Sequence, residues 1–463
     1  MTSSSLQTNL RSEVREILHL AVPLASAQVA QSATGFVDTV MMGRLGAENL
    51  AAGGLASLTF FALLSSASGA VMGVSPLVAE AFGSGKRSRI ELITRQGFWL
   101  SLILTIPMML ITGNMGSFML QTGQAPKTVE LATSYLNVML WGFFPALGFA
   151  MLRGVVSALS QAQPVMTIVI AGTVVNIIGN YALGFGHFGL PRLELAGLAI
   201  SSTVSLWVMF LALAIYTLKH EKLKQYRFYQ GLHRLNSRTL RELIWVGLPI
   251  GISSAFEIGL FTTITYLMGA LGTEVLAAHQ IVFQTVFVIF MVPLGMSFAI
   301  TARVGQLQGK NDYASIRQSG FLSIGLGAAF MVLMTAILLL FPQQVIGMYI
   351  NVQDPVNANV VAIALPILFV ASIVQVLDSL QKTALGGLYG IQDTRMPMLL
   401  NIVSYWMIGL PIGYFLGFKL GMSGTGLWIG QSIGVAIAAC IFIWRFHKLT
   451  HLKRRPKLKL VDR

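Results

Sequence analysis

Charged residues are scarce in this sequence, and cysteine is almost absent. Only 10% of its 463 residues are charged, whereas soluble chains carry about a quarter, so a soluble globular protein is excluded. The single cysteine, Cys440, rules out a disulfide within the chain, and no set of Cys and His has the spacing of a metal site. We therefore expect no structural metal, and we interpret Cys440 as a small buried packing residue.

Hydrophobic residues make up 55% of the chain and fall into long runs. A run of about twenty apolar residues can cross the hydrocarbon core of a bilayer as a helix. We expect no cleaved signal peptide, because the polar N-terminus lacks a cleavage site behind a short apolar core. The sequence predicts an all-α membrane protein of twelve transmembrane helices, near 17–41, 51–82, 92–113, 132–158, 166–186, 195–218, 243–268, 277–306, 319–341, 358–388, 398–418 and 423–446.

The net charge of +14 does not gather in one patch, as binding to nucleic acid would require. Basic residues cluster instead at the N-terminus, in the loops at 83–95 and 219–241, and in the C-terminal tail. By the positive-inside rule these segments are cytoplasmic. We predict a multi-pass protein of the plasma (inner) membrane with both termini in the cytoplasm, in contact with the lipid bilayer and with no nucleic acid.

The two halves of the chain repeat each other at a shift of 226 residues. The run Met42–Ala52, MGRLGAENLAA, matches Met268–Ala278, MGALGTEVLAA, and Pro23 matches Pro249. Each half holds six predicted spans, an even number, so the two repeats enter the membrane in the same direction. The sequence predicts an N-terminal six-helix lobe at 1–218, a cytoplasmic linker at 219–241, a C-terminal six-helix lobe at 242–446 and a basic cytoplasmic tail at 447–463.

Three carboxylates fall well inside predicted spans, namely Asp38, Glu257 and Asp378. Placing a carboxylate in hydrocarbon costs about 2.5–3.5 kcal/mol on the insertion scale, so each of the three acids is a candidate functional residue. Gln31, two helical turns before Asp38, is the repeat-equivalent of Glu257. The two halves therefore carry different polar side chains at equivalent positions inside the membrane. The alternative for each acid is a hydrogen bond that only holds two helices together.

No Lys or Arg is expected to partner these acids permanently. Arg153, Arg303 and Lys382 all fall close to the cytoplasmic ends of their predicted spans. Burial favours the protonated form of a carboxylate, and a bound cation favours the ionised form. The sequence thus favours a mobile partner at these acids, which would be Na+, H+ or a cationic substrate.

Uncharged polar side chains recur at the spacing of one helical turn. Asn176 and Asn180, followed by Tyr181, lie in the fifth span, and Gln280 and Gln284 lie in the eighth. Such pairs share a helix face and are expected either to line a substrate cleft or to join helices. We expect no enzyme, because no Ser/His/Asp set, HExxH motif or metal cluster can be assembled at membrane depth.

Four stretches of the sequence resemble the motifs of one transporter family. They are VDTVMMGRLGAENLAA, MGALGTEVLAAHQI, ARVGQLQGK and LGGLYGIQDTRMPMLLNIVSYWMIGLPIGY. The chain is similar over nearly its whole length to the multidrug and toxic-compound extrusion (MATE) transporters, NorM-like branch. The resemblance implies two six-helix bundles around a V-shaped cleft. It also implies export of cationic or amphipathic small molecules against inward Na+ or H+, without a cofactor.

The resemblance also implies roles for single residues. Asp38 matches the family's N-lobe acid linked to proton coupling and substrate, and Asn176 and Asn180 match the fifth-helix pair near it. Glu257 and Asp378 match the C-lobe acids of the cation site, so these two carboxylates are the candidate site for Na+, with the choice between Na+ and H+ left open. The expectation is a secondary active antiporter, working as a monomer. A flippase for lipid-linked precursors and a major-facilitator-type transporter are the alternatives.

Overall fold

The computed structural model describes residues 3–452 of the chain, with side chains from residue 11 to residue 451. Throughout this range the regular structure is helical and contains no strand, which confirms the predicted all-α fold. Most of the basic tail predicted at 447–463 lies outside the described residues.

The predicted spans all fall on helices. Within residues 3–452, eleven helices are long and apolar enough to cross a membrane, and each overlaps one of the predicted spans from 51–82 to 423–446. The remaining span, 17–41, lies inside α1 (Ser3–Arg44). This helix is long enough to cross, but its histidine, glutamine and aspartate side chains make it less apolar than the others.

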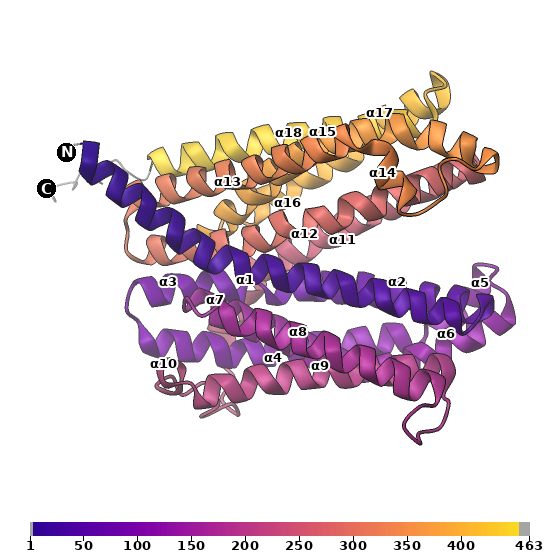
Figure 1. Cartoon of the computed structure of the whole chain (residues 1–463). Coiled ribbons are helices and arrows are strands. Elements are labelled where there is room, and N and C mark those ends of the chain that lie inside the picture. The colour runs from indigo at the N-terminus through magenta and orange to yellow at the C-terminus, as the bar shows by residue number, and fades with distance from the viewer. Residues whose placement is uncertain (1–2, 453–463) are drawn as a thin grey trace, which may run out of the picture. The chain divides into compact units, whose positions relative to one another are not determined.

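The described residues form two compact units (Figure 1). The first, called the N-unit, comprises residues 22–255, and the second, called the C-unit, comprises the described residues from 256 to 452 together with 3–21. The predicted lobes at 1–218 and 242–446 stay a prediction. The N-unit contains α2 (Ala47–Val71), α3 (Val74–Gly83), α4 (Arg87–Gly113), α5 (Met115–Gln121), α6 (Pro126–Met139), η1 (Leu140–Gly142), α7 (Phe143–Ala158), α8 (Gln163–Gly179), the π-helical η2 (Asn180–Gly184), α9 (Glu194–Lys219) and α10 (Glu221–Lys224).

The C-unit is built from the second copy of the repeat. A long helix, α11 (Ser237–Leu271), begins in the N-unit and ends in the C-unit. The rest of the C-unit consists of α12 (Thr273–Gly309), α13 (Tyr313–Leu340), α14 (Pro342–Gly347), η3 (Pro355–Asn357), α15 (Ala358–Gly390), α16 (Arg395–Ile402), the π-helical η4 (Val403–Gly409), α17 (Leu410–Tyr414), the π-helical η5 (Phe415–Lys419) and α18 (Ser423–Leu452).

The first helix of each half begins in the unit formed mainly by the other half. The start of α1 belongs to the C-unit, where Arg303 donates two hydrogen bonds to the Glu13 carboxylate, at 2.9 and 2.6 Å. The start of α11 belongs to the N-unit, where Arg89 donates to Glu242 at 2.7 Å. Burial raises the pKa of Glu13, but the hydrogen bonds and charge of Arg303 outweigh it and hold this pKa below 4.5.

Glycine lets α11 approach its neighbour in the N-unit backbone to backbone. A Cβ on Gly247 would lie only 1.8 Å from the carbonyl oxygen of Ala70 on α2, and one on Gly251 would lie 2.6 Å from that of Ser66. Small residues dominate such contacts in membranes, because lipid offers no hydrophobic force to press helices together. These two glycines fix the first turns of α11 against α2.

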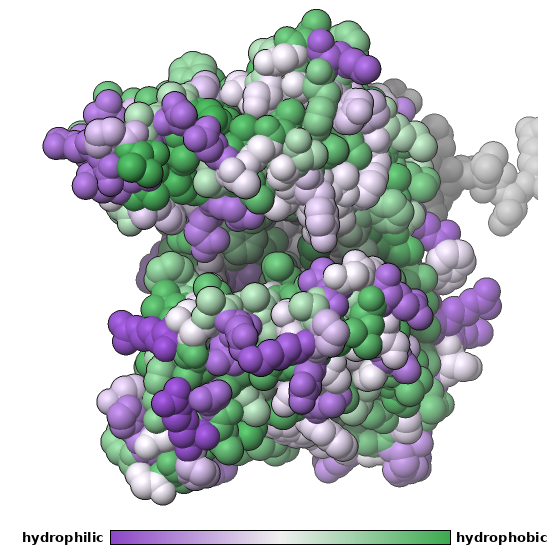
Figure 2. All heavy atoms as spheres, turned by 90° about the vertical axis from the view of Figure 1, so that its right-hand side faces the viewer, coloured by the Kyte–Doolittle hydropathy of each residue, from purple (hydrophilic) through white to green (hydrophobic). Residues whose placement is uncertain are grey.

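Large hydrophobic side chains stay exposed on the outer helix faces. On α4, Ile103, Ile106 and Leu110 are 42%, 55% and 63% exposed and follow one another at helical spacing. Hydrocarbon solvates such side chains, so this is the expected surface of a lipid-facing helix. Cys440 on α18 is also exposed, so the prediction of a buried packing residue is wrong. Figure 2 looks onto the helix ends, where hydrophilic side chains are interspersed with hydrophobic ones.

Candidate functional site

A polar cluster lies between the helices of the N-unit, around Asp38 of α1. Asn180 Nδ2 donates to Asp38 Oδ1 at 2.5 Å and also to Asn176 Oδ1 at 3.1 Å. Asn176 Nδ2 donates to the Ser202 hydroxyl of α9 at 3.0 Å, and this hydroxyl lies 3.4 Å from Asp38 Oδ2. The structure thus brings together three of the residues predicted from the sequence, with Ser202 as a fourth.

The local backbone places the two asparagines. Asn176 and Asn180 are one turn apart on the same helix face. Between them the α-helix α8 ends, and the π-helical turn η2 begins at Asn180. Single π-helical turns inside helices occur frequently at functional sites, because the extra residue per turn turns side chains towards a new direction. Here the residue at the transition is the one that binds the carboxylate.

The N-unit cluster is rich in hydrogen-bond acceptors and lacks a cation. No Lys, Arg or His of the described chain forms an ion pair with Asp38, which is half-buried. The Oδ1 atom of Asn180 is buried and has no hydrogen-bond donor within the described residues. A carboxylate beside an unpartnered carbonyl oxygen is suited to receive a proton or a cation.

A second cluster lies in the C-unit and contains a lysine. Lys382 Nζ of α15 donates to Glu257 Oε2 of α11 at 2.5 Å, and both side chains are mostly buried. The expectation that the membrane acids have no permanent basic partner is therefore wrong for Glu257. The long side chain of Lys382 reaches the acid from a position nearer the helix end, where its Nζ also lies 5.6 Å from the ring centre of Phe290.

Asp378 completes the C-unit cluster. It precedes Lys382 by four residues on α15, so the two side chains share a helix face. Between residues 11 and 451 no hydrogen bond or ion pair involves the Asp378 carboxylate. Two carboxylates face one ammonium group, and this leaves a single negative charge for a monovalent cation or a proton. No group of three or more His, Cys, Asp or Glu able to hold a metal ion exists in the part of the chain that is described.

The other predicted cleft residues do not join either cluster. Tyr181 is 46% exposed and stacks on His187, with ring centres 4.0 Å apart. Gln280 is exposed and Gln284 is half-buried. Neither glutamine side chain forms a hydrogen bond to another described residue. Contact with a substrate remains a prediction for these three residues.

His279 is held between two hydrogen-bonding neighbours in the C-unit. Trp428 Nε1 lies 3.2 Å from His279 Nδ1, and Thr265 Oγ1 lies 3.2 Å from His279 Nε2. The indole N–H can only donate, so Nδ1 must accept and the proton must reside on Nε2. Both ring nitrogens are then satisfied, which indicates a histidine that joins α11, α12 and α18.

Comparison with known proteins places the chain among related sequences. The MatE family model matches residues 23–182 and 249–415, two segments that begin 226 residues apart. The chain is 52% identical over 454 residues to a probable multidrug resistance protein NorM of Synechocystis sp., with 98% of each chain covered. It is 36% identical over 441 residues to a probable multidrug resistance protein NorM of Pseudomonas aeruginosa, covering 94% of this chain and 90% of that one.

Solved structures share the fold. One described as the outward-facing conformation of a multidrug resistance MATE family transporter of the MOP superfamily has a TM-score of 0.88, with 96% of this chain and 97% of that chain covered. A eukaryotic MATE transporter, AtDTX14, has a TM-score of 0.83, with 96% and 99% covered. Sequence identity to these two is 20% and 19%, so the likeness concerns the arrangement of the helices.

Proposed function

The chain belongs to the MATE family of membrane transporters, and from this premise we propose that it is a multidrug efflux antiporter. It exports cationic or amphipathic small molecules in exchange for inward Na+ or H+. The relatives named above support the export of drugs, since their names describe multidrug resistance. The observation that carries the coupling mechanism is the pair of membrane-embedded carboxylates, Asp38 and Asp378, that form no hydrogen bond or ion pair with a basic side chain within the described residues.

Asp38 is the proposed meeting point of proton and substrate in the N-unit. Its ionised form attracts a cationic compound, and its protonated form does not. Asn180 and Ser202 support the ionised form by donating to it, while the free Asn180 carbonyl oxygen can accept from a protonated carboxyl or contact a cation. Competition for one carboxylate would make uptake of the proton and release of the substrate a single event.

The C-unit cluster is proposed to bind the coupling cation. Lys382 neutralises one of its two carboxylates, so a second positive charge restores neutrality when it binds near Asp378. A monovalent ion meets this requirement, and a divalent ion would leave an excess positive charge. Either H+ or Na+ fits the charge, because a carboxylate can accept a proton or coordinate a hard cation.

The remaining assignments follow from the charge pattern. The basic loops at 83–95 and 219–241 favour a cytoplasmic location of both termini, in the plasma (inner) membrane. Both polar clusters form within one chain, so a monomer can supply every group that the mechanism uses.

The coupling is tested by efflux of a fluorescent cation from proteoliposomes under an imposed pH gradient and, separately, an imposed Na+ gradient. Asp38→Asn and Asp378→Asn should each lower gradient-driven efflux at least about tenfold, because a neutral amide cannot cycle between two charge states. The control is Glu48→Gln, which removes an exposed carboxylate that pairs with Lys127.

Undiminished efflux in both variants would refute the roles of these carboxylates. Stimulation of the unaltered protein by neither gradient would refute cation coupling and favour a flippase.

A further inference from the structure

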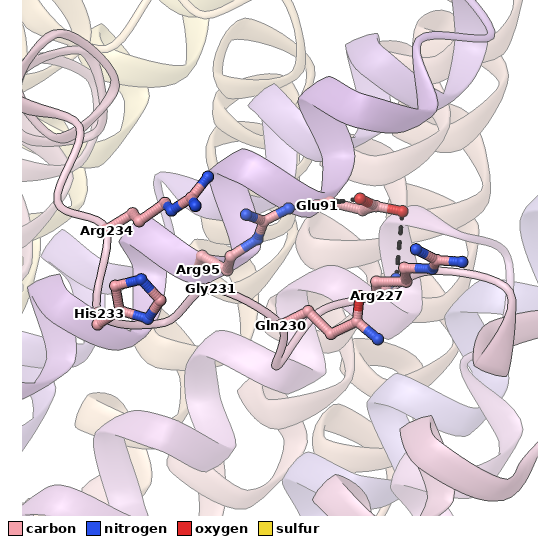
Figure 3. A pocket seen from close by; sticks show the side chains of 7 residues that line it. All are labelled: Glu91, Arg95, Arg227, Gln230, Gly231, His233 and Arg234. Carbon is pink, nitrogen blue, oxygen red and sulfur yellow. Dashed lines mark hydrogen bonds and ion pairs between the residues drawn. The ribbon is translucent and has the colours of Figure 1, made fainter.

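A basic pocket lies in the N-unit where the linker between the two repeats packs on the start of α4. It has a volume of about 390 Å3 and is lined by Glu91, Arg95, Arg227, Gln230, Gly231, His233 and Arg234 (Figure 3). Two of these residues belong to α4, and five belong to the linker. None of them takes part in the two polar clusters within the membrane helices.

The linker is held firmly on α4 by contacts to its backbone. The buried Gln96 side chain donates to the carbonyl oxygen of Arg234 at 3.0 Å and accepts from the amide of Asn236 at 3.1 Å. Trp99 Nε1 donates to the carbonyl oxygen of Leu232 at 2.6 Å, and the amide of Arg227 donates to Glu91 at 3.2 Å. The pocket is therefore preorganised, and a ligand would not have to order the loop.

One glycine allows the linker to close over the pocket floor. Gly231 has a φ of 72°, in the left-handed region, and a Cβ built on it would lie 3.3 Å from Nη1 of Arg95. Glycine accepts this φ without strain. The absence of a side chain also leaves the Arg95 guanidinium close beneath the loop.

The charges around the pocket are not balanced. Glu91 is the single acid in the lining, and its bonds are already shared between Arg87, Arg95 and the Arg227 amide. The exposed guanidinium groups of Arg227 and Arg234 form no ion pair with any described residue. Topology alone would explain basic residues in this loop. Topology does not explain why three arginines line one concave site whose single acid already has partners.

Trp99 indicates the depth of the pocket. Its indole lies one turn beyond Arg95 on α4, and indoles prefer the boundary between hydrocarbon and headgroups. The linker also connects a span that ends at Lys219 with one that begins at Ser237, so it lies at the same boundary. Basic pockets at this level on membrane proteins suit phosphate groups, because a guanidinium can bind two phosphate oxygens at once.

We propose that this pocket binds a phosphate-bearing anion through Arg227, Arg234 and Arg95. The source is the headgroup of an anionic phospholipid or a soluble phosphate compound, and both present the same oxygens to the arginines. Occupancy would tie the linker to the membrane surface or to the soluble anion.

The test compares two double variants of the full chain in phosphatidylcholine nanodiscs. Arg227→Gln/Arg234→Gln removes two charges from the pocket. Lys222→Gln/Lys224→Gln removes two exposed charges from the same linker outside it. The probes are spin-labelled phosphatidylglycerol, whose immobilised fraction is measured, and inorganic phosphate, measured by thermal stabilisation against chloride at equal ionic strength.

A phosphatidylglycerol affinity about tenfold lower in the pocket variant, and unchanged in the matched variant, supports a lipid site. Unchanged lipid affinity, with phosphate stabilisation lost only in the pocket variant, supports a site for a soluble anion. Equal weakening in both variants would mean general attraction to a basic surface and would overturn the proposal. So would the absence of binding by either probe to the unaltered protein.

Discussion

Replacing Lys382 by methionine removes the ammonium group that Glu257 binds in the C-unit. Methionine keeps most of the side-chain volume, and its sulfur can remain against the Phe290 ring. The Glu257 carboxylate then stays in the protein without its partner. Glu257→Gln makes the opposite change, because it leaves the lysine charge unpaired.

The size of the effect follows from how little water reaches the pair. The Lys382 and Glu257 side chains are only 9% and 15% exposed. Removing one partner of a buried ion pair costs about 3–5 kcal/mol of unfolding free energy. The remaining exposure suggests the lower end, about 3 kcal/mol for each single variant. The double variant Lys382→Met/Glu257→Gln buries neither charge, and such replacements are about neutral.

The four proteins are compared in detergent by thermal unfolding, followed through tryptophan fluorescence and monodispersity. Both single variants should melt well below the unaltered protein, and the double variant should recover most of the difference. Na+ should raise the melting temperature of Lys382→Met more than that of the unaltered protein, because the cluster then carries two uncompensated negative charges.

Additive losses in the double variant would refute the ion pair, since residues in direct contact should couple by about 0.5–3 kcal/mol. An equal response to Na+ in all four proteins would refute a Na+ site in this cluster and leave the proton as its coupling ion. The two readouts are independent, so the pairing could survive while the Na+ site fails.

Three further outcomes are expected. The Glu13→Gln variant should melt at a lower temperature than the unaltered protein at neutral pH. Because the pKa of Glu13 is lowered, its contribution to stability is present above pH 4.5 and is lost as the pH falls below that value. The difference between the two melting temperatures should therefore close at acidic pH. Gly247→Ala should cost about 1–3 kcal/mol through overpacking, whereas Gly54→Ala, whose Cβ meets nothing within 4 Å, should not lower the melting temperature. Asn180→Leu should reduce pH-driven efflux with little change in reconstituted protein, and normal efflux would show that Asp38 does not need this donor.

The pattern of the sequence was sufficient for the spans and for the polar positions, because both follow from spacing along a single helix. The run of apolar residues locates each span, and the spacing of four locates Asn176 and Asn180 on one face. The same spacing relates Asp378 to Lys382, so the sequence itself carries a signal for the lysine in this cluster. The position of Lys382 near the end of its span hides this pairing, because a lysine side chain extends several ångströms beyond its Cα.

Contacts between distant segments could not be obtained in this way. The Ser202 hydroxyl contacts Asp38 across a sequence separation of 164 residues. The spacing of residues along one helix cannot predict such a contact. The sequence predicts only topological charges in the linker, because the buried Gln96 that orders the loop belongs to a different helix. The outward position of Cys440 also depends on which face of α18 packs, which composition alone does not determine.

The exchange of helix ends between the two units has a consequence for the gene. A break in the coding sequence within 219–236 would give two polypeptides, and neither polypeptide would contain all the residues of one unit. The first would lack the α11 turns that Gly247 and Gly251 fit against α2, and would carry residues 1–21 without the surface that Glu13 binds. Each product could be completed only by the other, so the halves would have to be produced together to be of use.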